Sequence, residues 1–225
     1  MIIPWSGAAD SFLLAFPALF SIVNPIGGAL IYSQVTAGRT HAERKLLAGK
    51  IGIYSSLVML VALWGGAYVL NFFGISVAAL RIAGGLVVAV RAWELLSVPE
   101  QNEAMKQEQA APASAAEDVA FFPLTMPFTT GPGTISVAVA LGSNRPASAA
   151  GLIPFFFGMS AAAIVTALIV WIAYRSADRV VALLGNSRAR VVTRIMAFLL
   201  LCIGTQILVN GIIDVLGPLL APHTA

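Results

Sequence analysis

The chain has 225 residues, of which 59% are hydrophobic and only 10% are charged, and its mean hydropathy is +0.89. Soluble domains carry about 25% charged residues, so this composition excludes an ordinary water-soluble fold. The formal net charge of +3 does not indicate a nucleic-acid partner, because the basic residues lie between long apolar stretches, as they do in membrane proteins.

Six stretches of the sequence are long and apolar enough to cross a membrane, which takes about 20 residues per helix. The predicted spans are residues 11–35, 51–73, 75–97, 119–142, 150–173 and 192–217. Residues 98–118, rich in Gln, Glu, Ala and Pro, are predicted to form a polar cytoplasmic linker. The basic stretch 175–194 is predicted to lie at the membrane interface. We therefore predict an all-α integral membrane protein with six transmembrane helices.

The basic residues predict the orientation of these spans. Eleven of the thirteen lysines and arginines fall beside the loops that follow spans one, three and five. They are Arg39, Arg44, Lys45, Lys50, Arg91, Lys106, Arg175, Arg179, Arg188, Arg190 and Arg194. Only Arg81 and Arg145 fall on the opposite side. Since cytoplasmic loops hold the excess of basic residues, both termini are predicted to face outward, into the periplasm.

The two halves of the sequence carry matching landmarks. Pro25 and Pro132 are 107 residues apart, and Pro17 and Pro123 are 106 apart. Each half holds three predicted spans, an odd number, so the second copy enters the membrane in the opposite sense. This pattern predicts an inverted repeat, with one three-helix repeat in residues 1–97 and the other in 119–225.

The first span of each predicted repeat is interrupted by proline and glycine. The interruptions are residues 24–28 (Asn-Pro-Ile-Gly-Gly) and residues 129–134 (Thr-Thr-Gly-Pro-Gly-Thr). Proline removes a backbone donor and clashes with the preceding turn, and glycine adopts conformations that a helix does not use. A single proline in a membrane helix is commonly just a kink. Matched interruptions in both halves instead indicate the binding site of a transporter.

Each interruption would divide a helix into two halves with complementary ends. The later half presents free N–H groups and a partial positive charge, and the earlier half presents free carbonyls. The carboxylate and ammonium of an amino acid match these ends. The predicted substrate-binding residues are Asn24, Pro25, Gly27, Gly28, Thr129, Thr130, Gly131, Pro132, Gly133 and Thr134. The two prolines are expected to set the backbone of this site.

Groups typical of other functions are missing from the sequence. No carboxylate or histidine falls near the middle of a predicted span, which argues against a pump for lipophilic cations. Zinc-ligand spacings, nucleotide-binding glycine patterns and a Ser/His/Asp set are also missing. We therefore predict neither an enzyme nor a bound cofactor or metal. The coupling ion is left open between H⁺ and Na⁺.

Three segments together resemble one known family. They are residues 20–27 (Phe-Ser-Ile-Val-Asn-Pro-Ile-Gly), 122–127 (Phe-Pro-Leu-Thr-Met-Pro) and 131–136 (Gly-Pro-Gly-Thr-Ile-Ser). With these motifs in this order, the chain resembles the MarC family of bacterial inner-membrane proteins along essentially its whole length. The pair Thr129-Thr130 stands where we expect a more apolar, alanine-containing approach to Gly-Pro-Gly in relatives. The resemblance implies a polytopic inner-membrane protein with a role in amino acid transport.

These observations predict a secondary transporter of small neutral amino acids that works by alternating access around the paired broken helices. Its partners would be the lipid bilayer and its substrate, with the oligomeric state left open. One alternative is an exporter of other small metabolites or drugs. Another is a non-transporting scaffold or lipid-handling protein, in which the interruptions would pack against protein or lipid.

Overall fold

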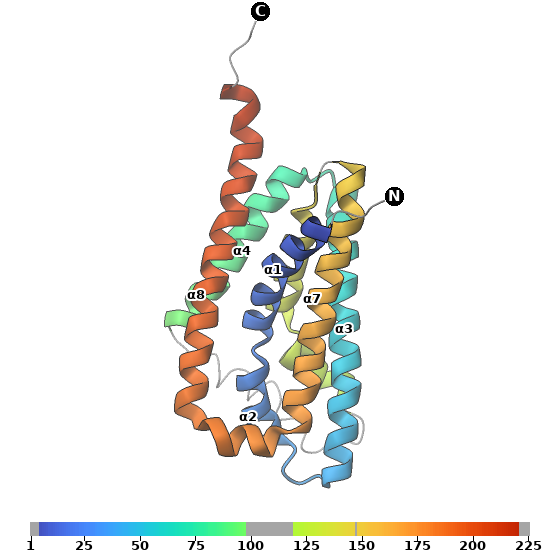
Figure 1. Ribbon diagram of the computed structural model, residues 1–225, viewed down its shortest axis with the longest axis vertical. Coiled ribbons are helices and arrows are strands. Elements are labelled where there is room, and N and C mark those ends of the chain that lie inside the picture. Colours follow the sequence, from blue (N-terminus) through green and yellow to red (C-terminus); the bar gives the residue numbers. More distant parts are fainter. Residues whose placement is uncertain (1–4, 98–118, 147, 221–225) are drawn as a thin grey trace, which may run out of the picture.

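A computed structural model describes residues 5–97, 119–146 and 148–220, and every regular element in these ranges is helical (Figure 1). The elements are α1 (Trp5–Val23), α2 (Pro25–Val35), α3 (His41–Phe72), α4 (Val77–Ser97), η2 (Ala120–Thr129), α6 (Pro132–Ser143), α7 (Ala149–Arg175) and α8 (Ala177–Leu220). The predicted all-α class is therefore confirmed for the part of the chain that the structure describes. The predicted linker 98–118 lies outside it.

Four stretches in these ranges are helical, long and apolar enough to cross a membrane. They are Gly7–Val35, His41–Gly66, Ala149–Arg175 and Ala197–Leu216. They correspond to the first, second, fifth and sixth predicted spans. The third predicted span is α4, and the fourth is divided between η2 and α6, of which α6 is apolar but shorter than a full span.

Two helices extend well beyond the apolar stretches that predicted them. Helix α3 begins at His41 rather than near residue 51, and α8 begins at Ala177 rather than near residue 192. Hydropathy marks only the part of a helix that fits the bilayer, whereas Lys, Arg, Glu and Ala favour continued helix outside it. The first part of α8 crosses one end of the bundle before the helix turns to run along it (Figure 1).

The helices pack in a defined set of pairs. Helix α4 packs on α8, α1 on α7, and α3 on both α6 and α7; α2 contacts α7 and α8, and η2 contacts α3. The start of α1 and the end of α8 lie toward the same end of the bundle, while the connection from α2 to α3 and the start of α8 lie at the other (Figure 1). The helices that flank each interruption therefore pack against helices from the other half of the chain.

Small residues allow this close packing. A Cβ at Gly85 of α4 would lie 2.4 Å from the Leu208 amide nitrogen, and one at Gly204 of α8 would lie 2.6 Å from the Ala89 amide nitrogen. Helices in lipid associate through such close contacts because the surrounding acyl chains are as apolar as the helix faces. Large apolar side chains such as Leu13, at 66% exposed, instead cover the outer surface, as expected for a surface solvated by lipid.

Two ion pairs tie α8 to its neighbours, one near each end of the bundle. Arg44 of α3 donates two hydrogen bonds to the Asp178 carboxylate, at 2.9 and 3.2 Å. Arg81 of α4 pairs with Asp214 and also donates to the Arg145 carbonyl at 2.9 Å. Asp214, one of the few acidic residues near a predicted span, is therefore held by a cation.

Candidate substrate site

The first interruption is shorter than the predicted residues 24–28: only Asn24 separates α1 from α2, and Gly27 and Gly28 lie within the first turns of α2. Its backbone has φ 50° and ψ 66°, the left-handed conformation, which ends a right-handed helix and which asparagine adopts more readily than most residues. The Asn24 amide donates to the Phe20 carbonyl at 2.9 Å, and its side-chain Oδ1 accepts from the Gly27 amide at 3.1 Å. Pro25 follows at the first helical position, where no N–H is needed. Asn24 thus ends one helix and caps the next.

The second interruption is longer than the sequence predicted and begins at Ala120. From Ala120 to Thr129 the turns are wide, with amides reaching back five residues: Leu124 donates to the Val119 carbonyl at 3.2 Å and Thr130 to the Thr125 carbonyl at 2.8 Å. The backbone is extended at the residues before the two internal prolines, Phe122 and Met126. A proline disfavours the helical conformation of the residue before it, so the spacing of Pro123 and Pro127 sets this geometry.

Threonine hydroxyls follow the same five-residue spacing. Thr125 Oγ1 donates to the Ala120 carbonyl at 2.7 Å, and Thr129 Oγ1 donates to the Leu124 carbonyl at 2.6 Å. Thr130 Oγ1 donates to the Thr125 carbonyl at 3.2 Å. All three side chains are buried. The predicted site residues Thr129 and Thr130 therefore use their hydroxyl hydrogens within the segment and keep oxygen lone pairs as acceptors.

Helix α6 starts immediately after this segment, and its N-terminal end has no side-chain cap. Gly131 is the residue before the helix, and a Cβ there would lie only 2.6 Å from the Pro127 carbonyl oxygen. Pro132 is exposed, Gly133 is half-buried, and Thr134 is 3% exposed. This end contrasts with the start of α2, where the Asn24 side chain already occupies one amide.

One tyrosine connects the first turns of α2 with the second interruption. The hydroxyl of Tyr174, in the last turn of α7, lies 3.1 Å from Thr129 Oγ1. A Cβ at Gly28 would lie 2.5 Å from the same hydroxyl oxygen. The Tyr174 ring stacks on Tyr32 of α2, with centroids 4.7 Å apart, and Tyr174 is only 2% exposed. Gly28 and Thr129, from opposite halves of the sequence, thus meet at one buried phenol.

The structure distributes the ten predicted residues unevenly. Gly28 and Thr129 are brought together, whereas Asn24 and Gly27 bond to each other within the cap of α2. Sequence reasoning missed Tyr174 and Tyr32. A tyrosine beside Arg175 at the end of an apolar run is typical of the aromatic belt at a membrane interface. Since α7 is apolar around its whole circumference, no periodicity indicated that Tyr174 faces inward.

Comparison with known proteins gives the family. A sequence model described as MarC family integral membrane protein matches residues 9–216. The chain belongs to the MarC family. The matched region contains both interruptions and Tyr174, so the candidate site lies wholly within the MarC-family part of the chain.

Curated MarC relatives are similar over nearly their whole length. The inner membrane protein MarC of Salmonella typhimurium is 31% identical over 210 residues, which cover 90% of this chain and 94% of the relative. The inner membrane protein MarC of Escherichia coli O6:H1 is 31% identical over 209 residues, with the same coverage. No solved structure matches the chain.

Proposed function

We propose that this MarC-family protein is a secondary transporter of the bacterial inner membrane that carries small neutral amino acids by alternating access. The observation that carries the proposal is the meeting of the start of α2 with the second interruption at Tyr174, through Gly28 on one side and Thr129 on the other. The backbone of η2 is not a continuous helix, because it is extended at Phe122 and Met126, and irregular backbone at membrane depth is tolerated only where it is buried in protein or lines a cavity. The names of the relatives, which place them in the inner membrane, support the same location here.

The packing supports an inverted repeat of residues 1–97 and 119–225. In such a repeat α1, α2, α3 and α4 correspond to η2, α6, α7 and α8. If the repeat is real, each contact between two helices should have a counterpart between their equivalents in the other repeat. The α1–α7 contact corresponds to η2–α3, the α2–α7 contact to α6–α3, and the α2–α8 contact to α6–α4. All six contacts occur. The α3–α7 and α4–α8 contacts convert into themselves, whereas the α1–α8 and α1–α6 contacts have no η2–α4 or η2–α2 counterpart of similar extent among the described residues. The positive-inside bias of the basic residues supports an orientation with both termini outside, and an inverted repeat would allow the halves to rock around the interruptions.

The start of α6 offers the chemistry for the substrate carboxylate. It has no side-chain cap, so the backbone amides of its first turn and the positive end of the helix are available to an anion. Carbonyls of the wide turns and the lone pairs of Thr129 and Thr130 would accept from the ammonium group. The backbone near these groups is closely packed, since a Cβ at Gly28 would meet the Tyr174 hydroxyl and one at Gly131 would meet the Pro127 carbonyl, so we expect the site to accept only a small side chain. Glycine, alanine, serine and threonine are therefore the proposed substrates.

Uptake by proteoliposomes tests this proposal. Reconstituted protein is expected to give saturable uptake of labelled alanine and glycine, and unlabelled serine or threonine is expected to compete. Imposing a proton gradient and a sodium gradient in separate experiments identifies the coupling ion. A folded preparation with no saturable flux of any small neutral amino acid would contradict the proposal. In that case, flux of other metabolites or drugs would indicate an exporter, and no flux of any solute would favour a scaffold or lipid-handling role.

A further inference from the structure

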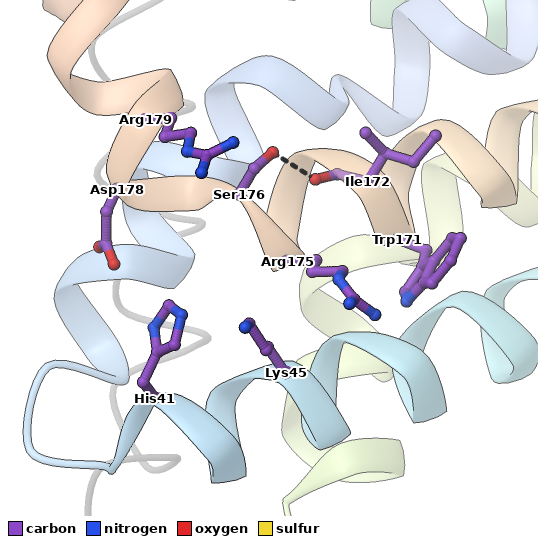
Figure 2. Close-up of a pocket in the computed structure, with 8 residues that line it drawn as sticks. All are labelled: His41, Lys45, Trp171, Ile172, Arg175, Ser176, Asp178 and Arg179. Carbon is purple, nitrogen blue, oxygen red and sulfur yellow. Dashed lines mark hydrogen bonds between the residues drawn. The ribbon is translucent and has the colours of Figure 1, made fainter.

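A basic cavity lies at the end of the bundle where α3 begins and α7 meets α8 (Figure 2). Its volume is about 770 Å³, and its lining includes Lys45 of α3, Trp171 and Arg175 of α7, and Arg179 of α8. Figure 2 shows that the cavity lies between side chains of α3, α7 and α8, with Trp171 and Arg175 both on α7. None of them belongs to the candidate substrate site.

The cavity has an excess of positive charge. Asp178 is its one acidic lining residue, and Arg44 binds this carboxylate through two hydrogen bonds. Within the described part of the chain, no carboxylate pairs with Lys45, Arg175 or Arg179. Three cations that pair with no carboxylate line one cavity, and they match an anion that brings several acceptor oxygens, such as a phosphate group.

An apolar groove continues from this cavity along the membrane-facing surface between α3 and α7. Its volume is about 550 Å³, and Gly49, Gly52 and Leu57 of α3 line it together with Leu168 and Trp171 of α7. Trp171 also lines the basic cavity, so the two hollows meet at this indole. Leu57 is 58% exposed and Leu168 is 48% exposed. The groove therefore opens sideways, toward lipid.

We propose that these joined hollows are a binding site for an anionic phospholipid, with its phosphate in the basic cavity and one acyl chain in the groove. Basic pockets between membrane helices bind anionic head groups, and Trp171 lies where an interfacial indole is expected, between the polar and apolar parts. A free phosphate would fill only the basic cavity and would leave the apolar groove unexplained. The site requires a membrane protein but does not depend on the proposed transport activity.

Native mass spectrometry and lipid-binding titration of the detergent-purified full chain test the basic cavity. The probes are phosphatidylglycerol, cardiolipin, phosphatidylethanolamine and inorganic phosphate. The anionic lipids are expected to bind the native chain more tightly than phosphatidylethanolamine does. The double variant Lys45→Gln/Arg179→Gln is expected to weaken phosphatidylglycerol binding by about tenfold or more. The matched control Lys50→Gln/Arg194→Gln removes the same charge outside the cavity and is expected to leave binding unchanged.

A second pair of variants tests the groove. Ser56→Trp puts a large side chain into the groove, so it is expected to weaken phosphatidylglycerol binding several-fold. Leu13→Trp enlarges an exposed residue of α1 and is expected to have no effect. Equal binding of anionic and zwitterionic lipids, or equal losses in the cavity and control variants, would overturn the proposal. Inorganic phosphate that displaces the lipid and is insensitive to Ser56→Trp would also overturn it, in favour of a free-phosphate site.

Discussion

Replacing Gly28 with alanine is expected to lower the free energy of unfolding by about 1–3 kcal/mol, the usual cost of adding a methyl group to a packed core. The new Cβ would lie 2.5 Å from the Tyr174 hydroxyl oxygen and 3.2 Å from two ring carbons. The phenol or the α2 backbone must therefore move, which is expected to weaken the contact between Tyr174 and Thr129. Thermal unfolding in detergent measures the loss. If this contact joins the two halves of the pathway, amino acid uptake is also expected to fall strongly.

Two further variants make the Gly28 prediction specific. Gly65→Ala places the same methyl group in α3, where no atom lies within 4 Å of the new Cβ, and is expected to be neutral or stabilising by up to about 1 kcal/mol. Tyr174→Phe removes the nearest atom, so Gly28→Ala is expected to cost less in that background. An equal cost in both backgrounds would show that the destabilisation does not arise at the Tyr174 hydroxyl.

Replacing Asn24 with alanine is expected to destabilise the protein by about 2–3 kcal/mol, the sum of two effects. Alanine would have to adopt the left-handed conformation with φ 50°, at a cost of roughly 1–2 kcal/mol. It would also leave the Gly27 amide without the side-chain acceptor 3.1 Å away, which costs about 1 kcal/mol. The same thermal unfolding measurement applies.

Asn24→Gly separates these two effects. Glycine adopts the left-handed conformation freely and is itself a tolerated cap, so it is expected to cost only a few tenths of a kcal/mol relative to asparagine. From most to least stable, the expected order at position 24 is therefore asparagine, glycine, alanine. A glycine variant as unstable as the alanine variant would contradict the assignment of Asn24 as a left-handed helix terminator.

The starts of α2 and α6 could be predicted because their causes are local. Pro25 and Pro132 lack the amide that a continuous helix needs, and each stands at the first turn of a new helix. The apolar stretches likewise predicted α7 almost residue for residue. The beginning of α3 at His41 could not be predicted in this way, because helix outside the bilayer leaves no hydropathy signal.

The connections between the halves could not be predicted from local patterns. Tyr174 reaches Thr129 across 45 positions of sequence, and nothing beside either residue indicates the other. The hydroxyl bonds of Thr129 and Thr130 depend on wide turns, and these arise only once Pro123 and Pro127 have extended the backbone before them. The sequence identified the two threonines as candidate ligands, but packing determines which of their atoms remain free to bind a substrate.

Two-sided labelling of a cysteine at position 134 tests most directly whether the interruptions belong to one solute pathway. The variant is Thr134→Cys in a Cys202→Ala background, with Leu141→Cys, fully buried in the same helix, as the control. Thr134 is 3% exposed in this structure, so labelling requires the bundle to open. Alternating access predicts that a membrane-impermeant thiol reagent labels position 134 from each side of the membrane in turn. Alanine is expected to slow this labelling, and position 141 is expected to stay protected. Protection of position 134 from both sides would contradict alternating access around the interruptions.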